Sequence, residues 1–163
     1  MLENLPEGIT EELLIYALIA VGLFVLAWLF FGYTIYSTLK LIKKENQCIL
    51  PNQAWFVALP FFNIYWNFEV VKRLADSLNN EFYDRQIETE ENPTRRAGQM
   101  FAWSFLITNI PLPAMMTLTV RLLSLVYFVT YWVKVAQNKR LLKLHIAHYG
   151  MEYTAIEKEE NEN

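Results

Sequence analysis

The sequence has few of the residues on which disulfide-stabilised domains and phosphate-binding enzymes depend. Cys48 is the only cysteine among 163 residues, so an intrachain disulfide is excluded. One cysteine does not indicate whether the protein lies in an oxidising or a reducing compartment. Glycine accounts for only 5 residues, and there is no glycine-rich phosphate loop, internal repeat or metal motif of recognised spacing. Serine and threonine residues in the apolar runs lack a neighbouring histidine or lysine base. The sequence therefore predicts a protein that is not an enzyme and has no cofactor.

Charged residues are missing from three long windows. No charge occurs over the 27 residues from Leu13 to Leu39, more than the roughly 20 that a helix needs to cross a bilayer core. Residues 46–68 and 97–120 also lack charge, and the last window extends past Arg121 to Val133. Since 54% of the chain is hydrophobic and 15% aromatic, a water-solvated globule is a poor fit. The windows predict an all-α membrane protein with four hydrophobic segments, at residues 13–39, 50–68, 97–112 and 113–133.

One helical membrane domain is expected over residues 1–150, followed by an acidic, disordered tail at 151–163. The domain includes a cytoplasmic helix and loop at 69–96, because apolar residues continue at helical spacing beyond Phe68 while charged residues occupy the other faces. Segment four is expected to have a similar amphipathic extension. The apolar stripe of the first extension must be covered by lipid headgroups or by the second extension.

The second segment is interrupted by residues that hydrocarbon does not tolerate. Pro60 removes a backbone donor in its middle, and Asn52, Gln53, Asn63 and Asn67 add side-chain amides. Non-helical backbone at membrane depth is tolerated only where it packs against protein or lines a wet cavity. Two arrangements stay open. Either the segment is broken at Pro60 and re-entrant, or it is a kinked full crossing.

Lysine and arginine residues near the segment ends set the orientation. Three lie in the first loop, five in the loop at 69–96 and four after the last segment. Four full crossings with a cytoplasmic N-terminus place nine of these residues inside and three outside. A re-entrant second segment with an exported N-terminus places all twelve inside. Both arrangements predict a cytoplasmic C-terminus.

Several motifs are shared with a known group of proteins. The run "LPFFNIYWNF" continues into "VVKRLADSLNNEF", "NPT" precedes the third apolar run, and "YWVKVAQNKRLL" ends the fourth. In this proline, asparagine and tryptophan spacing the chain, from Pro51 to Leu142, resembles small multi-pass bacterial inner-membrane proteins of unknown function. The resemblance implies a location in the bacterial inner membrane, and it supplies no catalytic residues.

Arg121 is the sharpest candidate for a functional residue. It lies eight residues after Pro113, inside the fourth segment, where a charge costs about 2.5–3.5 kcal/mol to insert. The charge-free windows supply no carboxylate to pair with it, so its anion would come from another subunit or from a lipid phosphate. The alternative is that Arg121 snorkels, or caps the carbonyls freed by Pro111 and Pro113.

The other partner- or lipid-binding candidates are polar and aromatic residues of the segments and a basic cluster beyond them: Asn63, Trp66, Asn109, Lys139, Arg140 and Lys143. His145 and His148 are three residues apart, a spacing that can place two imidazoles on one face for a metal. Without a third convincing ligand, we expect two solvated interfacial histidines and no metal site.

Two non-enzymatic functions are consistent with these features. The first is an accessory or scaffold subunit of a larger inner-membrane assembly, for which aromatic and amide surfaces supply helix packing. The alternative is a small transporter or lipid-binding protein that uses the broken second segment and Arg121. A polar cavity lined by Asn63, Asn109 and Arg121 in an oligomer of the chain would favour the alternative. The expected partners are anionic lipid headgroups and other membrane subunits or further copies of this chain, not nucleic acid.

Overall fold

The computed structural model describes the backbone of residues 7–162 and the side chains of residues 11–149, and it confirms the all-α class. Within this part of the chain there is no β-strand. The elements are four α-helices and two short 3₁₀ helices: α1 (Glu7–Leu39), η1 (Lys44–Asn46), η2 (Pro51–Ala58), α2 (Phe62–Asp84), α3 (Arg95–Thr108) and α4 (Ala114–Glu162).

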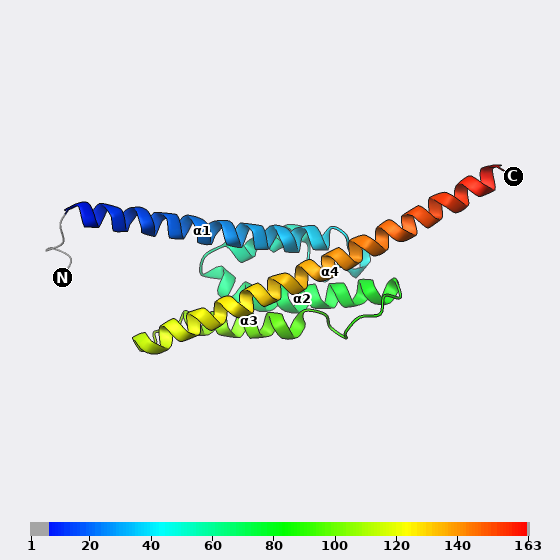
Figure 1. The fold of residues 1–163 in the computed structure, drawn as a ribbon. Coiled ribbons are helices and arrows are strands. Elements are labelled where there is room, and N and C mark those ends of the chain that lie inside the picture. Colours follow the sequence, from blue (N-terminus) through cyan, green and yellow to red (C-terminus); the bar gives the residue numbers. More distant parts are fainter. Residues whose placement is uncertain (1–6, 163) are drawn as a thin grey trace.

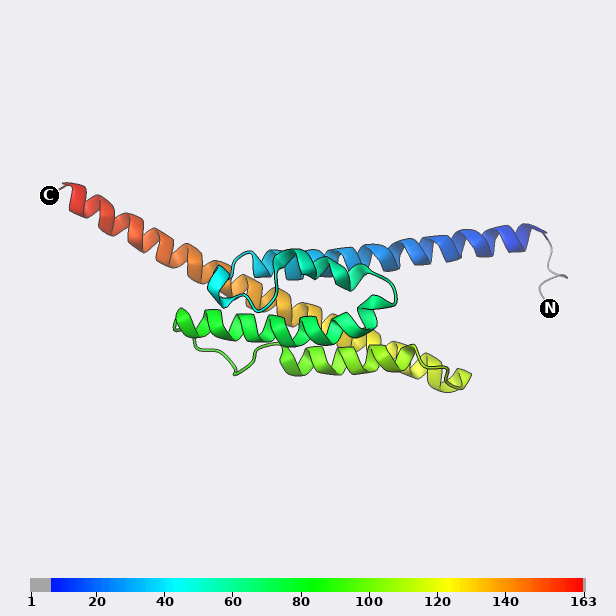
Figure 2. The ribbon, with the colours of Figure 1, turned by 180° about the vertical axis from the view of Figure 1, so that it is seen from behind.

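The helices lie side by side in alternating directions (Figure 1). α1, α2 and α4 run one way, while η2 and α3 return between them. The connections at 40–50 and 85–94 therefore lie at one end of the bundle, and the turns at 59–61 and 109–113 lie toward the other (Figures 1 and 2). The first half of α1 extends past the bundle at the turn end, and the second half of α4 extends past it at the loop end.

Two helices of the described chain, not four, are long and apolar enough to cross a membrane: Glu11–Leu39 and Ala114–Tyr149. The prediction of four crossing segments is therefore wrong for the second and third. α3 has 14 residues and extends about 21 Å, which is short of a bilayer core of about 30 Å. The second segment is not one helix, because it is divided between η2 and the first turns of α2.

The chain reverses direction at Pro60 and Phe61. Proline disfavours helical geometry in the residue before it, so η2 stops at Ala58. Phe61 then adopts a φ of 63°, uncommon outside glycine, and the Phe62 N–H donates to the Pro60 carbonyl over 2.7 Å. η2 and α2 form a hairpin with both open ends at the loop end of the molecule (Figure 2). This reversal has the geometry of the re-entrant arrangement and not of a kinked continuous helix.

An aromatic cluster joins α1, α3 and α4. Neighbouring rings lie with centroids 5.1–6.2 Å apart, mostly edge to face or tilted. The members are Trp28, Phe31, Phe101, Phe105, Phe128, Tyr131 and Trp132. Each such pair contributes about 0.5–1.5 kcal/mol beyond the burial of its area. The cluster therefore helps to hold α1, α3 and α4 together.

The amphipathic helix expected beyond Phe68 is confirmed as the second part of α2. Its stripe of Val71, Leu74, Leu78 and Phe82 is at most 2% exposed. α3, η2 and the 40–50 loop pack against α2, and the stripe belongs to a buried core that also contains Val135 and Leu142 of α4. The stripe is therefore core of the bundle.

A buried carboxylate of α2 fixes the 40–50 loop. Glu81 accepts hydrogen bonds from the Lys43 backbone N–H (3.0 Å), from Asn46 Nδ2 (2.9 Å) and from Arg85 Nε (2.6 Å). Burial raises the pKa of Glu81, but the donors outweigh it, so the pKa lies below the ordinary value of 4.5. The loop that follows α1 is thereby held against α2.

The backbone of residues 151–162 continues α4, where the acidic composition predicts a disordered tail. Glutamate, lysine, methionine and alanine in this stretch are good helix formers, and they favour a continuation of the preceding helix.

Gly98 marks the closest approach of α3 to its neighbours. A Cβ atom at this position would lie 2.6 Å from Val71 Cγ1 and 2.8 Å from Tyr131 Cε2, and both side chains are buried. We expect Gly98→Ala to lower the free energy of unfolding by about 1–3 kcal/mol through overpacking. Gly22→Ala is the matched control, since nothing lies within 4 Å of its Cβ. Equal shifts of the two variants in thermal unfolding in detergent would contradict this packing.

The Glu81 network predicts a pH dependence of stability. Because the folded pKa is lowered, the network stabilises the protein above the unfolded pKa near 4.5, and this contribution is lost as the pH falls through the folded value. At pH 7, Glu81→Gln should cost about 1–3 kcal/mol and should flatten the acid limb of the stability curve. Glu45→Gln, on the exposed surface of the same loop, is the control. An acid limb that is the same in Glu81→Gln and the parent protein would rule out the network as its source.

Candidate ligand cavity

A cavity of about 650 Å³ opens between four parts of the chain. The middle of α1, the hairpin tip at Pro60 and Phe61, the end of α3 and the first half of α4 all line it. Most of its wall is apolar or aromatic, from Phe24, Trp28, Phe105, Leu122, Leu125 and Phe128. Since Trp28, Phe105 and Phe128 also belong to the aromatic cluster, one side of the cavity is formed by the core of the bundle.

Three candidate residues from different parts of the sequence meet in this cavity. Asn63 comes from the first turn of α2, Asn109 from the residue after α3, and Arg121 from the second turn of α4. Thr108 and Ser124 are the other polar lining residues. The polar groups converge because both chain reversals, at 59–61 and 109–113, lie toward the same end of the bundle.

Asn63 and Asn109 contribute differently. Asn63 is 7% exposed, and its side-chain amide forms no hydrogen bond with the described residues. Asn109 Nδ2 donates to the Phe105 carbonyl over 2.8 Å and so helps to close the end of α3. Asn63 is therefore the amide that is free to contact a ligand, while Asn109 is partly engaged in structure.

Arg121 is exposed and, among the described residues, has no hydrogen-bond or ion-pair partner. It shares the cavity with Phe24 and Trp28, near the middle of the apolar stretch Glu11–Leu39. The lining contains no acidic residue. The guanidinium group thus lies beside the middle of α1 and near the start of α4, among mostly apolar side chains.

The carbonyls freed by the proline break are capped by another residue. Thr117 Oγ1 donates to the Leu112 carbonyl over 3.1 Å and to the Pro113 carbonyl over 3.2 Å. The alternative in which Arg121 caps these carbonyls is therefore not the arrangement seen.

The remaining candidates lie away from the cavity. Trp66 donates from Nε1 to the Gln53 carbonyl over 3.0 Å and stacks on Phe62 with centroids 5.4 Å apart, so it ties η2 to α2. Lys139 Nζ donates to Ser37 Oγ and ties α4 to α1.

The other charged and histidine candidates lie on the α4 extension. Arg140 and Lys143 are exposed there, as expected of a basic surface. His145 and His148 contact the ring of Tyr149, with centroids 4.3 Å and 5.8 Å away. No third metal-ligating side chain joins them among the described residues.

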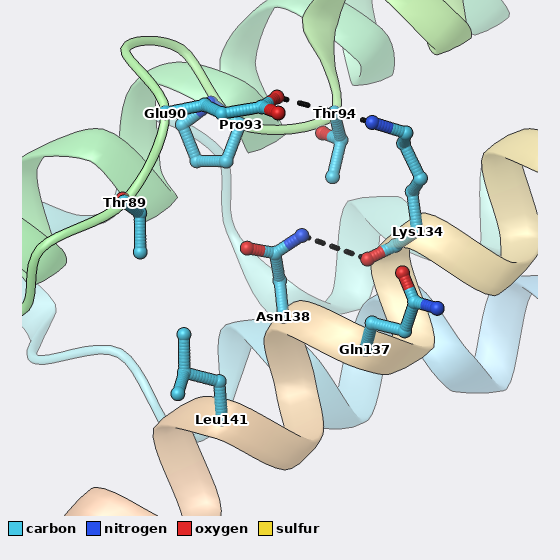
Figure 3. Close-up of a pocket in the computed structure, with 8 residues that line it drawn as sticks. All are labelled: Thr89, Glu90, Pro93, Thr94, Lys134, Gln137, Asn138 and Leu141. Carbon is cyan, nitrogen blue, oxygen red and sulfur yellow. Dashed lines mark hydrogen bonds and ion pairs between the residues drawn. The ribbon is translucent and has the colours of Figure 1, made fainter.

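A smaller polar pocket of about 220 Å³ lies at the loop end, between the 85–94 loop and α4 (Figure 3). Lys134 Nζ lies 3.9 Å from Glu90 Oε2, and Asn138 Nδ2 donates to the Lys134 carbonyl over 2.8 Å. The Thr94 hydroxyl in its wall is buried and has no hydrogen-bond partner. Since its lysine is already paired with a glutamate, this pocket joins the loop to α4 and is the weaker candidate for a site.

Sequence reasoning identifies the polar groups of the cavity but not its walls. Phe24 and Trp28 are four residues apart on α1, and Leu122 and Leu125 are three residues apart on α4. This helical spacing was the available signal. It does not distinguish a cavity wall from a lipid-facing surface, because both are apolar.

No protein-family model, curated protein or solved structure matches this chain. The functional proposal therefore depends on the geometry of the cavity and on the length and apolar surface of the helices. The resemblance to bacterial inner-membrane proteins stays a prediction.

Proposed function

We propose that this chain is a non-enzymatic protein of the bacterial inner membrane that binds an amphipathic ligand in the cavity beside Arg121. The observation that supports this most is the convergence of Asn63, Asn109 and Arg121 in one apolar-walled cavity. Its volume of about 650 Å³ lies in the range of about 300–1,000 Å³ that is typical of small-molecule sites. Apolar walls with a few convergent polar groups suit a ligand taken from the bilayer.

The character of α1 supports insertion in a membrane. Residues 11–26 are exposed on every face of the helix, although nearly all are apolar. In water such a surface would be an aggregation site, whereas hydrocarbon would cover it at no cost. α1 would cross the bilayer, and the η2–α2 hairpin would enter and leave at the loop end.

The charge distribution supports one orientation. The hairpin brings the basic residues of the 40–50 loop to the same end as Arg95, Arg96 and the α4 extension (Figure 1). Under the positive-inside rule this end would be cytoplasmic, and the start of α1 would be exported. The C-terminus of α4 would then also be cytoplasmic.

An accessory subunit is the second candidate. Residues 11–26 of α1 are exposed, and a helix of another subunit could cover them as lipid would. Arg121 could then pair with an acidic residue of that subunit. The convergence of three polar side chains in an apolar-walled cavity favours a small ligand over a helix, so ligand binding is the preferred function.

Filling the cavity tests the proposal. Ala27 is half-buried and lines the cavity. We expect Ala27→Phe to weaken the binding of dioleoyl phosphatidylglycerol to the purified protein at least tenfold, because the phenyl ring would fill the space that the lipid needs. Ala20→Phe makes the same change on the exposed part of α1, outside the cavity lining, and should bind as the parent protein does. Native mass spectrometry in an uncharged detergent measures both. If the two variants bind equally well, the cavity is not the binding site.

A further inference from the structure

We infer that the cavity selects an amphiphile with an acidic head, a carboxylate or a phosphate, and binds that head at the Arg121 guanidinium. This inference rests on the proposed function and adds the chemical class of the ligand. It follows from the charge of the cavity lining, from the absence of a partner for Arg121 among the described residues, and from the apolar wall of the cavity.

The charge of the lining is unbalanced. Arg121 is the one charged side chain among the residues that line the cavity. The ion pairs within the described chain all lie elsewhere, with acidic partners Glu69, Asp76, Glu81 and Glu90 on α2 and the 85–94 loop. A cation in an apolar frame is stable only when an anion or several acceptors pair with it. The described chain places no anion there.

Short side chains cap the carbonyls at the break between α3 and α4. Thr117 donates to the Leu112 and Pro113 carbonyls, and Asn109 donates to the Phe105 carbonyl. Arg121 itself has no hydrogen-bond or ion-pair partner among the described residues, so its guanidinium group is available to a group from outside the chain.

The donors of the cavity match an acidic head. A guanidinium group presents a planar fork of N–H groups that binds two oxygens of a carboxylate or a phosphate together. The side-chain amide of Asn63, which has no partner among the described residues, supplies a further donor in the same cavity. Trp28, Phe105 and Phe128 form the apolar wall for the first part of an acyl chain. This combination of donors and apolar wall suits an anionic amphiphile.

The tip of the η2–α2 hairpin lines the cavity. Pro60 and Phe61 are among the lining residues, and Phe61 is 87% exposed. Residues 11–26 of α1 are exposed as well. A ligand would therefore reach the cavity past the exposed hairpin tip, from the half of the bilayer that is opposite the basic loops.

Matched anionic and neutral ligands test the inference. The purified full-length protein is titrated at pH 8 with two pairs of ligands. Oleate and oleamide have the same single acyl chain and differ only in the head group, which is charged in oleate. Dioleoyl phosphatidylglycerol and dioleoylglycerol have the same two acyl chains and differ in the phosphate head group. We expect at least tenfold tighter binding of the anionic member in one or both pairs. Preference within the oleate pair identifies a carboxylate ligand, and preference within the glycerolipid pair identifies a phosphate.

Substitutions of Arg121 test whether its side chain causes the preference for anionic ligands. Arg121→Gln should remove the preference by weakening only the anionic ligands at least tenfold, and Arg121→Lys should retain part of it because lysine keeps the charge but loses the fork. Arg140→Gln, on the exposed basic surface of α4, is the matched control and should change nothing.

The outcomes separate the two proposals. If Arg121→Gln leaves the preference unchanged while Ala27→Phe still blocks binding, the inference about the acidic head is overturned and the proposed function stands. If Ala27→Phe does not block binding, the proposed function fails as well. If no amphiphile binds and a protein copurifies at equal stoichiometry only when Arg121 is present, the anion belongs to a partner subunit and the inference is overturned.

Discussion

The reversal of the chain at Pro60 and Phe61 is the constraint on which the rest of the structure depends. Proline stops η2, and the positive φ of Phe61 starts α2 in the opposite direction. The hairpin that results brings the lysines after α1 to the same end of the molecule as the other basic loops. Its tip also lines the cavity. One local backbone feature therefore relates the charge distribution to the position of the candidate site.

The aromatic cluster and the cavity share three of their side chains. Trp28, Phe105 and Phe128 contact the core rings on one side and the cavity on the other. Gly98 allows α3 to lie close to Val71 and Tyr131, which sets the position of the α3–α4 turn relative to the hairpin tip. The candidate ligand would therefore bind against the core of the bundle, and the exposed residues 11–26 of α1 lie outside that core.

The sequence predicts those parts of the fold that depend on local composition. The charge-free windows predict α1 and α4, and the apolar stripe from Val71 to Phe82 predicts the second part of α2. Polar residues within apolar windows also single out Asn63, Asn109 and Arg121, which do meet. The two false crossings have a physical reason, because average hydropathy does not show where a chain turns back. The cavity walls and the role of Gly98 depend on contacts between distant segments, which no local pattern contains.

The side of the membrane on which the 40–50 loop lies tests the central claim most directly. Cys48 is exposed in this loop, so a membrane-impermeant maleimide can report its side in intact cells. The account predicts that Cys48 is protected until the cells are permeabilised, while Glu11→Cys in a Cys48→Ser background is labelled from outside. Four full crossings with a cytoplasmic N-terminus export this loop instead. Labelling of Cys48 in intact cells, with protection of the cysteine at position 11, would contradict the re-entrant hairpin and the orientation built on it.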